Sequence, residues 1–343
     1  MSKKNLTKLK AILLAVLSVF GALILSVGVV FLNAAIPADA AASGYEWDED
    51  TPFSPALGPA LDMNGRDFKI LILTDRHYTR VFGDRRTDRL ADSLISQSKP
   101  DLIVLLGDQC FTPFNRAAYR HLIRRMDGYG IPWAPVFGNH DEQGKATKNY
   151  LADMLAKSEY CLFRSGPKIG GAGNYFVNLT DGGSFVHTLY FLDSTVKKNG
   201  DYQPPSAGQV KWYEWAAGGT AAYTGETVPS TLFVHIPLPE YAPAYDAAVA
   251  EGAVLYGARR EKECASRVNS GLFDKLVEIG STKGVFCGHD HVNDYSVMCR
   301  GVRLTYSLSS GYGSYGNKNL KGGTELVIKT DGTTEQAPLH FNK

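Results

Sequence analysis

The feature that most constrains the fold is a regular alternation of apolar runs and amphipathic stretches between residues 68 and 139. FKILILT (68–74), DLIVLLG (101–107) and IPWAPVFG (131–138) are almost entirely apolar, which is typical of strands covered on both faces. The stretches between them carry apolar residues at helical spacing. A β-α-β-α-β order places the three strands parallel, joined by right-handed crossovers. The sequence therefore predicts an α/β fold.

Each of these predicted strands is followed at once by a side chain that can bind a metal ion or transfer a proton. Asp75 follows the first strand, Asp108 the second, and Asn139 and His140 the third. The carboxyl ends of parallel strands meet at one edge of a sheet, where open α/β sheets bind their ligands. We therefore expect these four side chains to lie close together.

The second half of the chain predicts a more antiparallel arrangement and supplies histidines. Residues 174–194 hold two strand patterns around an Asp-Gly-Gly turn. The strand pattern STLFVHIP carries His235 near its end, and GVFCGHDH carries His289 and His291. In an extended backbone the last two imidazoles project to the same side, because side-chain direction alternates along a strand. One imidazole can then serve each of two metal ions.

Taken singly, these signals are weak, since a lone histidine such as His235 is more often a hydrogen-bonded structural residue. Their order is specific: D-x-H, GD, GNHD, His and GHDH, each at the end of an apolar run. Imidazoles, carboxylates and one amide form a ligand set suited to Mn, Fe or Zn rather than to Ca or Mg. Two such ions about 3.5–4 Å apart can clamp a phosphoryl group. One carboxylate must bridge them, and Asp108 is the natural candidate.

These five blocks resemble the calcineurin-like metallophosphoesterase family, and the resemblance covers residues 68 to 295. It implies a four-layer sandwich of two mixed β-sheets flanked by α-helices. It also implies two metal sites that share one carboxylate. The first site is expected to be formed by Asp75, His77, Asp108 and His291, and the second by Asp108, Asn139, His235 and His289.

The resemblance also implies which residues act on the substrate. His140 is expected to contact the substrate and protonate the leaving oxygen, with Asp141 orienting it and Asn139 as a further substrate contact. Arg76 lies between two expected ligands. It either contacts a phosphate or points to the opposite face and pairs with an acidic neighbour.

Departures from the family pattern narrow the subgroup. Protein Ser/Thr phosphatases continue the GD block as GDxxDR, whereas this chain reads GDQCF. Purple acid phosphatases carry a tyrosine ligand at the position of Phe111 and lack the histidine that corresponds to His77. The stretches VHIPLPEY and GHDHVNDY nevertheless look like the exported, purple-acid-phosphatase-like branch. We therefore expect a dinuclear site without the strong visible tyrosinate band of the purple enzymes.

The N-terminal segment has the pattern of a targeting signal. Four lysines precede an uncharged run over residues 11–32, and IPADAAASG then offers small residues in the spacing of a signal-peptidase site. We expect residues 1–42 to be a signal peptide or, alternatively, an uncleaved membrane anchor, with the body exported in either case. Residues 43–66 are predicted to be a linker or leading arm, and residues 67–343 the phosphoesterase domain.

The cysteines are few and odd in number, so the chain is no disulfide scaffold. Their spacing also excludes a Cys-rich structural zinc site. Cys287 and Cys299 flank a predicted hairpin about Arg300 and Gly301 and form the candidate disulfide pair.

The predicted function is dinuclear metal-dependent hydrolysis of a phosphate monoester or diester by a metal-bridging hydroxide, with two divalent or trivalent ions as cofactors. An exported nuclease or cyclic-nucleotide phosphodiesterase, and a catalytically silent metal-containing surface binding protein, stay open as alternatives. The 36 Lys and Arg residues nearly balance the 35 Asp and Glu residues. A polymeric nucleic acid favours a basic surface, so we expect a small phosphorylated substrate, and membrane contact only through the N-terminal segment if it is uncleaved.

Overall fold

The computed structural model describes residues 10, 12–21, 36–80, 83–194 and 197–341. Most of the predicted signal peptide or anchor lies outside these residues, so that expectation stays a prediction. Within the described residues, no helix combines the length and apolar character needed to cross a membrane.

The predicted β-α-β-α-β unit is confirmed and forms most of a five-stranded sheet. Its strands β2 (Phe68–Leu73), β3 (Leu102–Leu106) and β4 (Trp133–Val136) are parallel, and α2 (Asp84–Ser98) and α3 (Asn115–Asp127) connect them. Two antiparallel strands complete the sheet in the order β12-β11-β2-β3-β4, namely β11 (Gly322–Ile328) and β12 (Thr334–His340).

A seven-stranded sheet is built mainly from the second half of the chain, in the order β1-β5-β6-β7-β8-β10-β9. Its strands are β1 (Ala60–Asp62), β5 (Tyr175–Asp181), β6 (Ser184–Leu192), β7 (Ser230–Val234), β8 (Thr282–Cys287), β9 (Ser296–Cys299) and β10 (Val302–Tyr306).

The sheet is less antiparallel than the sequence predicted. The expected hairpins β5–β6 and β9–β10 are present, but β6, β7, β8 and β10 run parallel. Helices make two of these parallel connections: α5 (Ala207–Thr224) joins β6 to β7, while α6 (Tyr241–Glu251) and α7 (Leu272–Ile279) join β7 to β8. Strand β9 makes the third, from β8 to β10.

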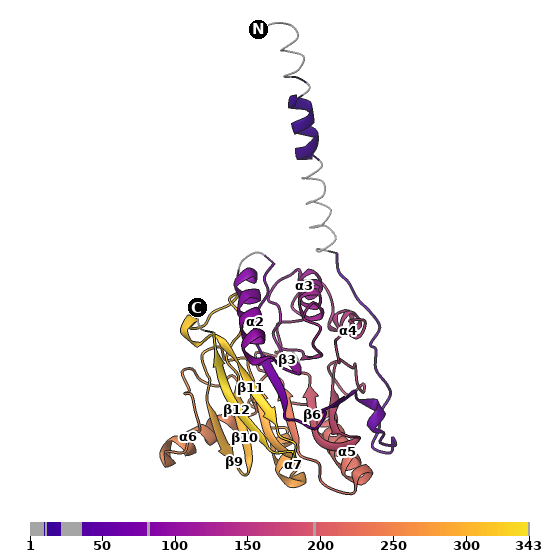
Figure 1. Cartoon of the computed structure of the whole chain (residues 1–343), viewed down its shortest axis with the longest axis vertical. Coiled ribbons are helices and arrows are strands. Elements are labelled where there is room, and N and C mark those ends of the chain that lie inside the picture. Colours follow the sequence, from indigo (N-terminus) through magenta and orange to yellow (C-terminus); the bar gives the residue numbers. More distant parts are fainter. Residues whose placement is uncertain (1–9, 11, 22–35, 81–82, 195–196, 342–343) are drawn as a thin grey trace.

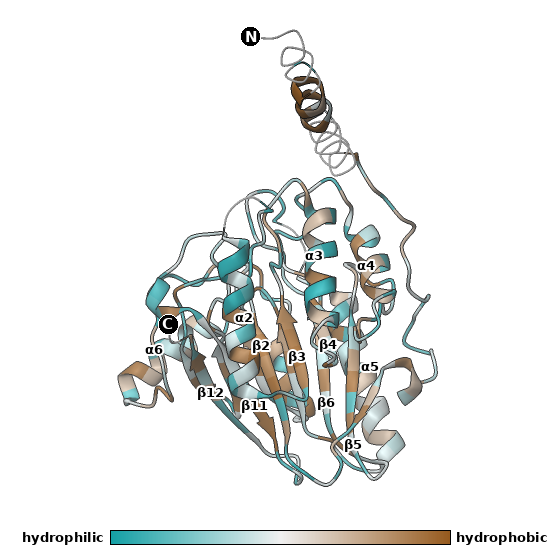
Figure 2. Ribbon diagram, turned by 45° about the horizontal axis from the view of Figure 1, so that its top comes forward, coloured by the Kyte–Doolittle hydropathy of each residue, from teal (hydrophilic) through white to brown (hydrophobic). Residues whose placement is uncertain are grey.

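The two sheets pack face to face between layers of helices, so the fold is the expected four-layer sandwich of two mixed sheets. Helices α2, α3 and α4 (Lys148–Ala156) lie on the five-stranded side (Figure 1), and the side chains of α5 and α7 pack on the seven-stranded sheet. The strands β2 and β3 are strongly apolar, whereas the helices that cover them carry hydrophilic residues (Figure 2).

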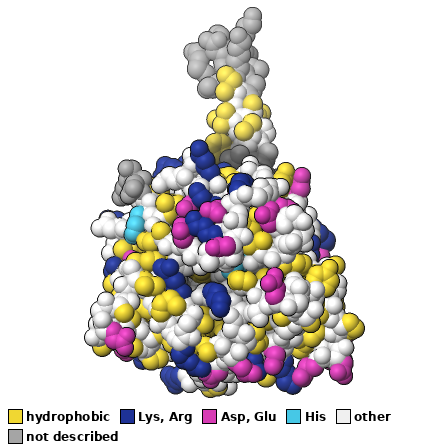
Figure 3. Space-filling view, turned by 60° about the horizontal axis from the view of Figure 1, so that its bottom comes forward, with side chains coloured by type: hydrophobic (Ala, Val, Ile, Leu, Met, Phe, Trp, Pro, Cys, Tyr) yellow, Lys and Arg dark blue, Asp and Glu magenta, His cyan; other side chains and the backbone are white. Residues whose placement is uncertain are grey.

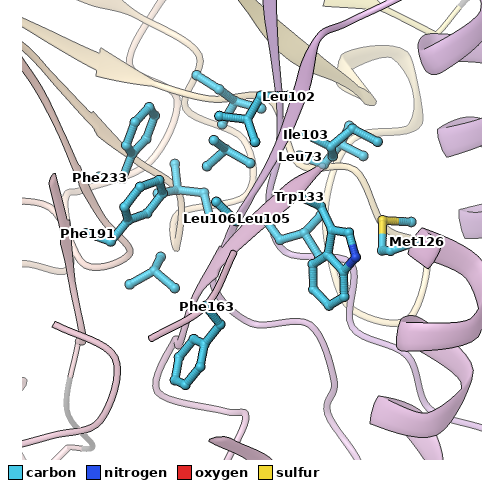
Figure 4. Packing of buried hydrophobic residues seen from close by; sticks show 14 of the residues in the cluster. Leu73, Leu102, Ile103, Leu105, Leu106, Met126, Trp133, Phe163, Phe191 and Phe233 are labelled. Atoms are coloured by element: carbon cyan, nitrogen blue, oxygen red, sulfur yellow. The ribbon is translucent and has the colours of Figure 1, made fainter. Parts of the chain in front are cut away.

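The core between the sheets fixes how their strand ends meet. Phe191, Phe233 and Phe286 form a stacked row across β6, β7 and β8, with ring centroids 5.0 and 5.6 Å apart. Figure 4 shows Phe191 and Phe233 beside the β3 residues Leu105 and Leu106. Burial of such side chains contributes about 1.5–3 kcal/mol each.

The segment 43–66 lies along the domain as an arm rather than as a free linker (Figure 1). The backbone of Tyr45 bonds Gly166 and Lys168, and Phe53 packs against Phe176 and Trp215. The arm also adds β1 to the seven-stranded sheet, parallel to β5.

The proposed disulfide between Cys287 and Cys299 is wrong, because all five cysteines are free. The hairpin about Arg300 is present, but its second strand, β10, inserts between β8 and β9. Cys287 at the end of β8 is therefore separated from Cys299 by a whole strand.

Candidate metal centre

Histidine and carboxylate side chains from both sheets converge at the carboxyl ends of five parallel strands. The five-stranded sheet contributes Asp75 and His77 after β2, Asp108 after β3, and Asn139 and His140 after β4. The seven-stranded sheet contributes His235 after β7, and His289 and His291 after β8. The backbone turns sharply at these strand ends, and φ is positive at Asp75, His77, Asp108 and His289 (51°, 46°, 50° and 74°). Such strain persists where the surrounding structure imposes it, commonly at functional sites.

The first group of possible metal ligands consists of Asp75, His77 and His291. One ligand atom from each lies within 4.8 Å of the other two, and all three side chains are buried. The Nε2 atoms of the two imidazoles are 3.0 Å apart, and Asp75 Oδ1 is 3.2 Å from His291 Nε2. The three side chains therefore point at one small volume.

The second group consists of Asp108, His235 and His289, which are also buried and also lie within 4.8 Å of one another. Asp108 connects the two groups: its Oδ2 atom is 3.1 Å from His235 Nε2 and 3.8 Å from His77 Nε2. Its other oxygen accepts a hydrogen bond from the backbone N–H of His140 at 2.8 Å. This position fits the bridging carboxylate that two neighbouring metal ions require.

Several polar atoms in the cluster are buried and have no hydrogen-bond partner among the described residues. They include Asp75 Oδ1, Asp108 Oδ2, Asn139 Oδ1 and His235 Nε2. An unsatisfied buried polar group costs about 1–3 kcal/mol, so a native protein rarely keeps several together without a reason. Carboxylate, amide and imidazole atoms are suitable donors to Mn, Fe or Zn ions. The residues present therefore fit the metal centre that the sequence predicts.

The charges of the metal-free cluster are strongly interdependent. Burial lowers the pKa of His235, but the neighbouring Asp108 and Asp75 carboxylates outweigh burial and raise it to about 10. Burial, together with the charge on His235, lowers the pKa of His289 to about 3. A metal ligand must be a neutral imidazole, so metal binding at neutral pH has to displace the proton of His235.

Two of the histidines are held by hydrogen bonds on their outer nitrogen atoms. His235 Nδ1 donates to the carbonyl of Leu106 at 2.8 Å, and His291 Nδ1 donates to the carbonyl of Tyr315 at 2.9 Å. In the neutral imidazoles these bonds keep the proton on Nδ1, so that the lone pair of Nε2 faces the cluster, as in many metal sites.

The glycines of the GN and GH blocks are required by close packing. A Cβ atom at Gly138 would lie 2.2 Å from Asp108 Oδ1, and one at Gly288 would lie 2.1 Å from Thr74 Oγ1. Any larger residue at these positions would displace the strand ends that carry the ligands.

His140 lies at the rim of the cluster, with its Nε2 atom 3.9 Å from Asp108 Oδ2 and 29 % of its side chain exposed. Its Nδ1 atom is 2.8 Å from Gln143 Oε1 and donates to it. Sequence reasoning missed Gln143, although a polar side chain three residues after the GNHD histidine was a usable signal.

The expectation that Asp141 orients His140 through its carboxylate is wrong. This buried carboxylate accepts hydrogen bonds from the backbone N–H groups of Gln109 and Gly138, both at 2.8 Å. It therefore braces the loops that follow β3 and β4, while Gln143 holds the imidazole.

The expectation that Arg76 contacts the substrate is also wrong. The side chain is fully buried, and its guanidinium donates to the Tyr78 hydroxyl and lies 3.6 Å from Met126 Sδ on α3. Asp75 and His77 point into the cluster, and Arg76 between them points away from it. Of the two alternatives, the structure has the second, although the contacts are to Tyr78 and Met126 rather than to a carboxylate.

Comparison with known proteins agrees with this geometry. Residues 68–293 match the sequence pattern of the family described as calcineurin-like phosphoesterase. The chain belongs to this family. The match includes the strands of both sheets that carry the candidate ligands.

Three comparisons illustrate the similarity. The chain is 32 % identical over 299 residues to a protein of Arabidopsis thaliana named probable inactive purple acid phosphatase 14, covering 73 % of this chain and 72 % of that one. It is 30 % identical to phosphatase DCR2 of Saccharomyces cerevisiae, covering 76 % of this chain and 50 % of that one. Among solved structures, a dimetal phosphatase from Danio rerio aligns over 79 % of this chain and 99 % of its own, with 13 % identity and a TM-score of 0.47.

Proposed function

We propose that this calcineurin-like phosphoesterase hydrolyses phosphate esters with two metal ions in its candidate metal centre. One observation carries the proposal. Buried candidate ligand atoms, without hydrogen-bond partners in the described part of the chain, converge beside an accessible imidazole, His140, that the proposed metal centre does not need. The residues proposed to hold the ions are Asp75, His77, Asp108, Asn139, His235, His289 and His291.

When bound, two such ions polarise phosphoryl oxygens and supply a strong nucleophile at neutral pH. The protein positions the candidate ligands and a proton donor. Asp108 belongs to the second group, and its Oδ2 atom lies 3.8 Å from His77 Nε2 of the first group, so this carboxylate would contribute to both ions. Gln143 keeps the proton of His140 on Nδ1, so that Nε2 faces the centre. When His140 is protonated, Nε2 can donate a proton to the oxygen that leaves phosphorus.

A second candidate, a metal-binding protein without turnover, is favoured by the names of some relatives, which describe them as probable inactive purple acid phosphatases. A structural metal site needs neither an imidazole at the rim nor a side chain that orients it. His140 and Gln143 therefore favour catalysis over this alternative.

We propose a small phosphate ester as the substrate rather than a polymeric nucleic acid. Formal charge is only +1 over the whole chain. On the face in Figure 3, basic and acidic side chains are interspersed rather than sorted into a basic stripe. A nucleic-acid backbone would draw its affinity from such a stripe.

The test is hydrolysis of a small aryl phosphate and a bis-aryl phosphate by the purified full chain, after chelation and reloading with Mn, Zn or Fe. We expect turnover of at least one ester that requires added metal and is lost again with chelator. The ratio of monoester to diester rates assigns the preferred bond. Two bound ions without turnover of either ester would establish the silent alternative.

A further inference from the structure

Phe111 is an exposed apolar side chain directly beside the metal centre. Its side chain is 47 % exposed, whereas the metal-ligand candidates are buried. Its backbone N–H donates to the carbonyl of Tyr78 at 3.1 Å, and Tyr78 N–H donates to the carbonyl of Gln109 at 2.9 Å. The loop that presents the ring is therefore fixed to the loop that carries His77.

The Phe111 ring lies against the imidazole proposed to protonate the leaving oxygen. Its centroid is 4.6 Å from that of His140, with an interplanar angle of 60°. It also meets His77 edge-on at 6.0 Å and 86°. Because His140 Nε2 must reach the leaving oxygen, the group attached to that oxygen comes within reach of the exposed face of Phe111.

We propose that Phe111 forms a subsite for a planar aromatic leaving group, so that the preferred substrates are phosphate esters of ring-bearing alcohols. The inference rests on the proposed function. The exposed surface of the Phe111 ring makes no favourable contact with water. Contact with a second ring would remove this apolar surface from water and add a directional attraction between the rings. An alkyl leaving group of the same charge would gain less of this contact.

Tyr315 offers a matched comparison, because it is also an exposed aromatic residue in contact with a ligand. It is 54 % exposed and stacks on His291 at 4.2 Å. Its hydroxyl donates to Glu261 at 3.0 Å and accepts from the backbone N–H of His291 at 3.3 Å. These bonds make Tyr315 a positioning residue for a candidate ligand, and none of them reaches His140.

The experiment compares phenyl phosphate with ethyl phosphate in the wild type, Phe111→Ala and Tyr315→Ala, each as the full metal-loaded chain. We expect the Phe111→Ala change to lower the preference in kcat/KM for phenyl over ethyl phosphate about fivefold, the size of one aromatic contact. Tyr315→Ala should lower kcat/KM for both esters together. An equal effect of Phe111→Ala on both esters would mean that the ring only shields His140, and would overturn the proposal.

A binding measurement separates this inference from the proposed function. Calorimetry should show that phenylphosphonate binds the wild type more tightly than methylphosphonate, and that Phe111→Ala removes the difference. These phosphonates need no turnover, so the subsite is tested even in a silent protein. Equal affinities of the two phosphonates for the wild type would refute the subsite, whatever the hydrolysis assays show.

Discussion

Two fully buried histidines, near opposite ends of the same strand pair, differ in what surrounds them. His187 on β6 has partners for both ring nitrogens: Nε2 is 2.9 Å from the hydroxyl of Thr231, near the start of β7, and Nδ1 is 3.3 Å from the carbonyl of Gly332. His235 lies just beyond the end of β7. Its Nε2 atom faces Asp75 and Asp108 and has no hydrogen-bond partner among the residues that the structure describes.

The difference shows in their pKa values, which move in opposite directions. Burial without a carboxylate lowers the pKa of His187 to about 4, whereas two carboxylates raise that of His235 to about 10. Burial alone is therefore no sign of function. An unsatisfied nitrogen among unsatisfied carboxylates is such a sign, and it distinguishes the carboxyl ends of the strands from the other end of the sandwich.

The largest effect is expected at Asp108, which joins the two ligand groups. Asp108→Asn keeps the shape of the side chain but removes the charge that two cations must share. We expect turnover on an aryl phosphate to fall at least about a thousandfold, with loss of at least one bound metal ion by elemental analysis. Survival of most of the turnover would exclude Asp108 as the bridge.

The same substitution at both ends of β6 and β7 tests the comparison directly. His235→Gln should lower turnover at least about a hundredfold, because it removes a proposed ligand nitrogen. His187→Gln can donate to Gly332 and accept from Thr231, and should keep near-normal turnover and both metal ions. A comparable loss in both variants would show that the assay reports folding rather than the metal centre.

The sequence was sufficient to predict how the strands bring these residues together, and insufficient wherever the answer depends on tertiary neighbours. Asp75 and Asp108 were predictable because each follows an apolar strand, and parallel strands of one sheet share an edge. His235 follows a strand of the other sheet, and only the family resemblance placed it with them. The position of β10 between β8 and β9 was not predictable, because strand order is set by packing rather than by local pattern. Helix α6 was missed since its alanines and tyrosines show no clear apolar face.

The orientation of individual side chains also could not be predicted from the sequence. Asp141 and Arg76 adjoin expected active residues, but adjacency in sequence does not fix direction. Asp141 turns to the backbone of the neighbouring loops, and Arg76 turns to Tyr78. The roles of the converging residues as metal ligands stay a prediction that metal analysis decides.

A smaller effect is expected at Gln143. Gln143→Ala removes the acceptor that holds His140 Nδ1, so the imidazole loses its fixed tautomer and orientation. We expect kcat to fall about tenfold, the equivalent of one lost hydrogen bond, with KM and metal content unchanged. Gln143→Glu keeps an acceptor at the same position and should restore most of kcat. Failure of this rescue would assign Gln143 a structural role instead.

The smallest effect is a loss of stability at acidic pH that we attribute to the protonation of His187. Below about pH 6.5 the unfolded chain protonates this histidine, whereas the folded protein resists until about pH 4. Falling pH therefore favours unfolding. At pH 5 the free energy of unfolding should be about 2 kcal/mol lower than at pH 7 because of His187. Urea unfolding of the wild type and His187→Gln at both pH values measures the difference, in which the contributions of the metal-centre histidines cancel. His187→Gln should lose less stability on acidification, and equal losses would mean that His187 is protonated in the folded protein.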